Sequence, residues 1–281
     1  MSQPVKEPAS IFDMVTFGYK KAFKTLWPVT RICLPLLVVY AAGSGLIEAI
    51  ASGLLPDKLR VDLHNLFSSA LLVLNWSIAC YARDAYWREA EPNPMTYLKP
   101  NRTLLGVAGI GLITAFYGIG AGLAGMLGLL LLVVPGIVIF SYFYIWSGLF
   151  YTVYLLEPEN GVWAARHRVA ALLRGYFKRT AGFGLLAGLV WLLAMTPVIF
   201  MSVGLELLKE LPPSFFHATL FYGLYGLLDG AMEWFILAFG FTGYSFILNR
   251  YYDDLQVRRE QAFNSVVNLE TVRQADRQAN G

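Results

Sequence analysis

The sequence predicts an all-α protein: a polytopic membrane helix bundle of about six transmembrane helices, with two amphipathic interfacial helices on the cytoplasmic side. Of its 281 residues 57% are apolar and only 15% are charged, against roughly 25% charged in an ordinary soluble domain. Several apolar runs exceed the roughly 18 residues that a helix needs to cross a hydrocarbon core of about 30 Å. The alternating pattern of barrel strands is missing, and unclosed strands would leave their backbone groups unpaired in lipid.

The apolar runs define six expected spans. They cover roughly residues 32–54, 66–82, 104–122, 127–151, 181–205 and one stretch within 220–248. The uncharged run from Leu104 to Leu156 is too long for one crossing, so it holds two spans joined by a turn in the glycine-rich segment 120–128. Residues 1–250 then form one transmembrane domain. Residues 251–281 form a polar cytoplasmic tail, expected to be a short helix with a disordered end.

The positive charges predict the orientation. Of the 22 Lys and Arg residues, 19 fall in the N-terminal segment, the second and fourth loops and the tail, which share one side, and three fall on the other side. Cytoplasmic loops of membrane proteins carry such an excess of Lys and Arg. We therefore expect a multi-pass protein of the bacterial inner membrane with both termini in the cytoplasm.

Two segments, residues 10–27 and 162–179, have apolar residues at helical spacing and cations on the opposite face. Ser10 with Asp13 three residues later predicts a helix cap. Basic amphipathic helices are attracted to anionic lipid, by about 1 kcal/mol for each cation near the surface. The cations expected to contact lipid at the cytoplasmic leaflet are Lys20, Lys24, Arg166, Arg168, Arg174 and Lys178. The alternative, that these helices only cap the bundle, stays open.

Pro135 and Gly136 lie in the most apolar part of the chain, inside the expected fourth span. Proline in a helix removes one backbone hydrogen bond and clashes with the preceding turn, while glycine lets a neighbouring helix approach. The pair therefore predicts a helix kink.

Three acids lie in or near the spans: Glu48, Asp229 and Glu233. Asp229 and Glu233 are four residues apart and share one helix face. Ionisable groups in hydrocarbon are costly and face a bundle interior, a partner or a water-filled cavity, so the three acids are a candidate ion or substrate site. If the last span begins at Leu220, both acids lie near mid-membrane. If it begins near Ala231, both lie at the outer interface at little cost, and we favour this second placement.

No catalytic motif is present. The three histidines lie in separate loops, and the sequence holds no nucleophile elbow, P-loop or dinucleotide fingerprint. We expect no enzyme activity, no cofactor, no metal site and no nucleic-acid partner. The expected partners are membrane lipids, together with a membrane protein or a second copy of the chain.

One stretch of the sequence resembles a known family. A leucine-rich run leads into Pro135-Gly136, an aromatic-rich span follows, and then come Leu156-Glu157, Gly161 and Ala164 before a basic helix. With the closing Tyr251-Tyr252-Asp253-Asp254-Leu255, this pattern resembles the YciC-like group of bacterial inner-membrane proteins. It is also similar to the membrane domain that precedes some glycerophosphodiester phosphodiesterases, but no phosphodiesterase domain follows here. The resemblance implies a membrane fold and no particular activity.

Two functions follow as hypotheses. The first is a non-enzymatic inner-membrane protein that serves envelope or lipid homeostasis through contacts with lipid or a partner protein. The alternative is a small-solute or ion-coupled transporter that uses the three acids, with the Pro135-Gly136 break as a hinge.

Overall fold

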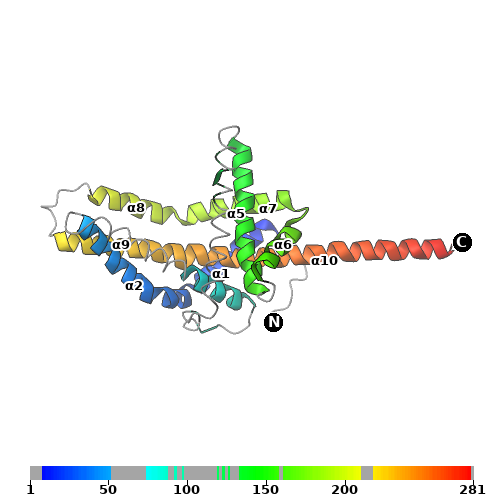
Figure 1. Cartoon of the computed structure of the whole chain (residues 1–281), viewed down its shortest axis with the longest axis horizontal. Helices are drawn as coiled ribbons and strands as arrows, with labels where there is room; N and C mark the ends of the chain where they lie inside the picture. The colour runs from blue at the N-terminus through cyan, green and yellow to red at the C-terminus, as the bar shows by residue number, and fades with distance from the viewer. Residues whose placement is uncertain are drawn as a thin grey trace.

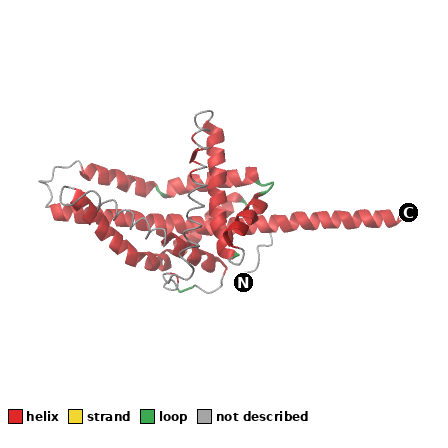
Figure 2. Cartoon of the chain, in the orientation of Figure 1, coloured by secondary structure: helices red, strands yellow, loops and turns green. Residues whose placement is uncertain are grey.

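The computed structural model describes residues 8–51, 74–87, 133–157, 161–209 and 218–279, with a few single positions between 92 and 126. All regular secondary structure in these residues is helical, which confirms the predicted all-α class (Figure 2). Besides a helix over residues 74–87, the elements are α1 (Ile11–Lys24), α2 (Leu26–Ala51), α5 (Val133–Leu156), α6 (Gly161–Leu173), α7 (Phe177–Ala194), α8 (Thr196–Lys209), α9 (Ala218–Phe235), the π-helical η4 (Ile236–Phe241) and α10 (Thr242–Ala279).

Four described helices are long and apolar enough to cross a membrane. Their apolar stretches are Leu26–Ser44, Pro135–Leu156, Phe177–Ala194 and one within Leu224–Asn264. They match the first, fourth, fifth and sixth expected spans. The second expected span is described only from residue 74, and the third lies almost wholly outside the described residues. The number of six spans is therefore not confirmed.

A long central rod organises the fold. The elements α9, η4 and α10 follow one another without a loop, and both α1–α2 and α7–α8 run antiparallel to this rod (Figure 1). The register follows from contacts whose residue numbers rise along one segment and fall along the rod. For α1–α2 they are Ala9 with Asp254, Tyr19 with Phe239, Thr30 with Trp234, and Ser44 with Asp229. For α7–α8 they are Thr180 with Tyr251, Met195 with Gly240, and Ser202 with Met232.

The rod and its two antiparallel partners are all irregular at about the same position along the long axis of the rod. The α1–α2 path breaks at Thr25, between its contacts with Phe239 and Trp234 of the rod. The α7–α8 path breaks at Met195, which contacts Gly240 in η4. Each break is followed within three residues by a proline, Pro28 or Pro197. Proline fits the first turn of a new helix but its ring clashes with the carbonyl four residues earlier, so each helix ends before it.

The rod's own irregularity is the π-helix η4. The hydroxyl of Thr242 donates to the carbonyl of Leu237, five residues back, at 3.0 Å. The backbone N–H of Thr242 bonds the same carbonyl, which is the spacing of a π-helix. Such single-turn π segments are frequent at functional sites.

Glycines allow the closest helix contacts. A Cβ at Gly18 of α1 would collide with the Ile247 side chain and lie 2.9 Å from the carbonyl oxygen of Gly243, and one at Gly230 of α9 would lie 2.7 Å from the Cβ of Ala41. Small residues at these positions let helix backbones approach, as helices packed in lipid require.

Helix α5 does not belong to the antiparallel set, because it crosses the long axis of the other helices (Figure 1). It packs against α7 and α10 through two more glycines. A Cβ at Gly184 of α7 would lie 2.6 Å from the backbone oxygen of Ser141, and one at Gly148 of α5 would collide with Tyr244. The described helices therefore form a rod with two antiparallel partners and one crossing helix.

Several helix ends differ from the expected ones. The helix expected over residues 162–179 ends at Leu173, because Gly175 adopts a φ of 88° and the N–H of Tyr176 bonds the carbonyl of Leu173. The expected span 181–205 begins earlier, at Phe177, and is interrupted at Met195. In the tail, α10 continues as helix to Ala279, whereas a short helix with a disordered end was expected.

The described part of α5 begins at Val133, so Pro135 and Gly136 lie in its first turn. Proline is tolerated in a first turn, since its missing N–H has no acceptor within the helix there. Residues 127–132 of the expected span lie outside the described residues, and the kink stays a prediction.

Candidate functional site

A groove lies where the end of α1 meets the central rod. The last two turns of α1 and one side chain of η4 enclose a volume of about 550 Å³. Its walls are aromatic and its rim is basic, and it is lined by Phe17, Tyr19, Lys20, Lys21, Phe23, Lys24 and Phe239. The rings of Tyr19 and Phe239 are 5.4 Å apart between centroids, so they join the α1 wall to the η4 wall.

The sequence positions these side chains through the cap and the register of α1. Ser10 caps the helix as predicted, since its hydroxyl accepts the N–H of Asp13 at 3.1 Å. Met14, Val15, Gly18 and Ala22 are buried. With this face packed inward, Lys20 and Lys24 are left exposed, and 71% of the Phe23 side chain is accessible.

The rim of the groove is cationic. Lys20 and Lys24 are exposed and Lys21 is half-buried. Among the side chains that the structure describes, no carboxylate forms an ion pair with any of the three. Trp27 continues the exposed aromatic surface just after the break at Thr25, and the Arg31 guanidinium lies 5.2 Å from its ring centroid.

The other cations expected to contact lipid lie on α6 and around its C-terminal end. On α6, Arg166 is exposed with its guanidinium 5.9 Å from the ring of the exposed Trp163. Arg168 is 3.2 Å from the Glu157 carboxylate. Arg174 follows the end of α6, and Lys178 belongs to α7. None of these four lines the groove at α1.

The acids Asp229 and Glu233 both face α2. The hydroxyl of Ser44 donates to a carboxylate oxygen of Asp229 at 2.6 Å. The Tyr40 side chain lies beside both acids and interacts with Asp229. Both acids are half-buried. Glu48 belongs to α2, but its side chain lies outside the described part, so its place relative to this pair stays a prediction.

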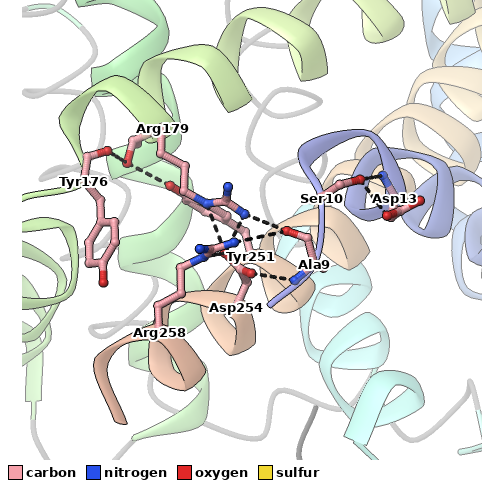
Figure 3. A network of polar contacts seen from close by, with 9 residues as sticks. Ala9, Ser10, Asp13, Tyr176, Arg179, Tyr251, Asp254 and Arg258 are labelled. Carbon is pink, nitrogen blue, oxygen red and sulfur yellow. Dashed lines mark hydrogen bonds and ion pairs between the residues drawn. The ribbon is translucent and has the colours of Figure 1, made fainter. Parts of the chain in front are cut away.

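A second polar network surrounds four consecutive buried residues of α10: Tyr251, Tyr252, Asp253 and Asp254. Each contacts a different neighbour. Tyr251 bonds Thr180 of α7 at 2.8 Å, Tyr252 donates to Glu157 at 2.8 Å, and Asp253 accepts from Tyr86 at 2.6 Å. Asp254 accepts the N–H of Ala9 at 2.8 Å and contacts Arg179 and Arg258, both at 2.9 Å (Figure 3).

Burial, together with the neighbouring Asp253 carboxylate, raises the pKa of the Tyr86 hydroxyl above its ordinary value. The hydroxyl therefore keeps its proton and acts as the donor to Asp253. Because the four residues of α10 are occupied by contacts within the chain, this network is suited to joining helix ends.

The groove was only partly predictable. Lys20 and Lys24 were expected to contact lipid, but Lys21, Phe17 and Tyr19 were not selected as site residues, and the contribution of Phe239 was missed. Phe239 is 220 residues away from Tyr19 in sequence, and no local pattern signals their contact. The signal that was available was the density of aromatic residues and lysines between Phe17 and Trp27.

Comparison with known proteins gives no match: no family model, no curated protein and no solved structure is similar to this chain. The resemblance to the YciC-like group stays a prediction.

Proposed function

We propose that this chain is a multi-pass protein of the bacterial inner membrane that acts without catalysis, in envelope or lipid homeostasis, by binding anionic lipid at the cytoplasmic leaflet. One observation carries the proposal: three lysines without a described counter-ion lie beside exposed aromatic rings at the end of α1. Cations attract anionic headgroups, and aromatic rings favour the membrane–water interface.

The register of the rod supports a particular placement in the bilayer. The Lys20–Lys24 turn is level with Phe239, through Tyr19. If this turn marks the cytoplasmic interface, the network around Asp254 lies in the cytoplasm, where its charges cost little. Helix α7, whose Thr180 is level with Tyr251 and whose C-terminal Met195 is level with Gly240, then lies on the same side and does not cross the membrane. Asp229 is ten residues from Phe239 along the rod, which is about 15 Å at 1.5 Å per residue. In a core of about 30 Å this is close to mid-membrane, deeper than the interfacial placement that the sequence favoured.

Helix α6 supplies a second surface of the same chemistry. Trp163 is 66% exposed and lies next to Arg166. Helix α6 therefore pairs an aromatic ring with a cation, as the end of α1 does. We assign α6 a weaker contact with the same leaflet. The resemblance to the YciC-like group agrees with a non-catalytic role, because Tyr251 to Asp254, which carry part of it, bond to other parts of this chain.

Thermal unfolding in detergent micelles tests the proposal. Adding phosphatidylglycerol should raise the unfolding temperature more than the same amount of phosphatidylcholine, because a ligand that binds only the folded state stabilises it. The difference should shrink as salt is raised, since exposed charges are screened. Equal effects of the two lipids at low salt would contradict the proposal.

A specific observation also favours the alternative, an ion-coupled or small-solute transporter. Asp229, with Ser44 and Tyr40 against it and Glu233 one turn away, lies about two turns before the irregular η4. Intramembrane acids mark proton and ion paths in many transporters. Proton or cation flux into proteoliposomes tests it: a carrier should lose flux in the Asp229→Asn, Glu233→Gln variant, whereas absence of flux in the unmodified protein would exclude proton or cation coupling.

A further inference from the structure

We propose that the groove between α1 and η4 is a discrete phospholipid site, which holds one acyl chain of an anionic phospholipid while Lys20, Lys21 and Lys24 hold its phosphate. This inference rests on the proposed function and goes further, because it replaces a diffuse attraction to the leaflet with one bound molecule at a defined place.

The walls of the groove fit a hydrocarbon chain. Four aromatic residues line it, and they come from two elements that are far apart in sequence: Phe17, Tyr19 and Phe23 from α1, and Phe239 from η4. Its volume of about 550 Å³ lies within the roughly 300–1,000 Å³ of pockets that hold small molecules. Burying an apolar chain against these rings is favourable in proportion to the area removed from water.

Phe239, which lines the groove, contacts a further aromatic ring along the rod. The rings of Phe239 and Phe235 are 5.4 Å apart between centroids, and Phe235 is only half-buried. An acyl chain that enters beside the lysines can therefore lie against Phe239 and continue toward Phe235. This direction leads from the proposed interface toward the hydrocarbon core, as it must for a lipid that remains part of the leaflet.

The rim selects the headgroup. Three lysines within five residues line an apolar groove, and no described carboxylate pairs with them. An anionic phospholipid supplies one uncompensated negative charge to this rim. A zwitterionic phospholipid brings its own cation, which the lysines repel. Charge complementarity therefore favours phosphatidylglycerol-like lipids over phosphatidylcholine-like ones.

Photo-crosslinking tests the site. The full-length protein in nanodiscs is exposed to phosphatidylglycerol that carries a diazirine on its acyl chain, and adducts are located by peptide mass spectrometry. We expect adducts on the peptides that contain Phe17–Phe23 and Phe239. Phosphatidylcholine with the same labelled chain should give several-fold fewer adducts there, and unlabelled phosphatidylglycerol should compete for the site.

Variants separate the rim from general surface charge. Each Lys→Gln change at positions 20, 21 and 24 should weaken adduct formation at the groove roughly fivefold, since each cation near the surface contributes about a factor of this size. Lys178→Gln is the matched control, because this exposed cation of α7 does not line the groove, and it should leave the adducts unchanged. If the triple variant does not fold, the single variants and the competition experiment decide.

The outcomes distinguish the two proposals. Adducts spread evenly over exposed apolar positions such as Phe200 and Val203 of α8, while phosphatidylglycerol still stabilises the protein, would overturn the discrete site and leave the proposed function standing. A groove occupied by a second copy would give no lipid adduct there, which would also overturn it. Failure of the proposed function itself would appear as equal stabilisation by the two lipids.

Discussion

Arg179 and Asp254 form an ion pair in which the carboxylate is almost fully enclosed. The guanidinium nitrogen lies 2.9 Å from the carboxylate oxygen, and the Asp254 side chain is only 1% exposed. The same guanidinium donates to the carbonyl of Ala9 at 2.7 Å, and the N–H of Ala9 donates back to Asp254 at 2.8 Å (Figure 3). One buried carboxylate thus joins α7, α10 and the segment that leads into α1.

Removing that carboxylate should be strongly destabilising. Asp254→Asn leaves Arg179 and Arg258 without their counter-ion and weakens the bond to Ala9. Breaking a buried pair by removing one partner costs about 3–5 kcal/mol. The free energy of unfolding in detergent, measured with denaturant, should fall by an amount of this order.

Glu157→Gln is the control for this prediction. Glu157 pairs with Arg168, whose side chain is 43% exposed, and exposed pairs contribute about 0–1 kcal/mol. The amide oxygen of the glutamine can still accept the hydrogen bond from Tyr252. Its effect should therefore be much smaller. Equal losses in the two variants would show that burial of Asp254 is not what makes its pair important.

Gly18 should not tolerate even one methyl group. Its Cβ would collide with Ile247 and lie 2.9 Å from the Gly243 oxygen, which belongs to the backbone and cannot rotate away. Gly18→Ala should cost about 1–3 kcal/mol, the usual cost of overpacking. Gly188→Ala is the matched control, because a Cβ at that position meets nothing within 4 Å. It should be neutral or stabilise α7 by up to about 1 kcal/mol. Thermal unfolding of the two variants in one detergent tests the contrast, and a tolerated Gly18→Ala would contradict the close α1–α10 contact.

Features within a single helix could be predicted from the sequence, but the register between helices could not. The cap at Ser10 and the apolar stretches of four helices follow from residue type and spacing over a few turns. The breaks at Thr25 and Met195 had a local signal in the prolines that follow them. That both breaks lie beside η4 depends on packing against a segment about 210 residues from Thr25 and about 45 residues from Met195, and no pattern within a helix encodes it.

The candidate site shows the same division. The lysines of α1 were predictable as cations of an amphipathic helix. Their groove was not, since Phe239 completes it from the far end of the chain. The placement of the acids also needed the register, because the apolar run 220–248 is longer than a bilayer requires and does not itself say which residues lie at its centre.

Ser44 on α2 should contribute measurably through its bond to Asp229. Ser44→Ala removes a donor that lies 2.6 Å from the carboxylate oxygen. Hydrogen bonds between membrane helices average about 0.6 kcal/mol and reach about 1.7 kcal/mol, and a charged acceptor belongs at the upper end. Ser202→Ala is the control, because within the described part of the chain that hydroxyl bonds the sulfur of Met232, a weak acceptor. Denaturant titration of both variants should show the larger loss for Ser44→Ala, and the reverse order would contradict the assignment.

The depth of the acid pair can be measured directly. In a variant without Cys33 and Cys80, a cysteine introduced by Glu233→Cys should react slowly with a membrane-impermeant maleimide, because position 233 lies inside the hydrocarbon if the lysine turn of α1 marks the cytoplasmic interface, as we propose. Along the rod it is six residues, about 9 Å, deeper than Phe239. Glu260→Cys, at an exposed position of α10, should react fast in inverted membrane vesicles and slowly in intact cells, because the proposed orientation puts it on the cytoplasmic side. If Glu233→Cys reacts as fast as Glu260→Cys in inverted vesicles, position 233 is open to water from the cytoplasm. If it reacts fast in intact cells, the acids lie at the outer interface, and the lysine turn of α1 would have to lie inside the hydrocarbon. That result would contradict the placement of the lysine turn at the cytoplasmic interface.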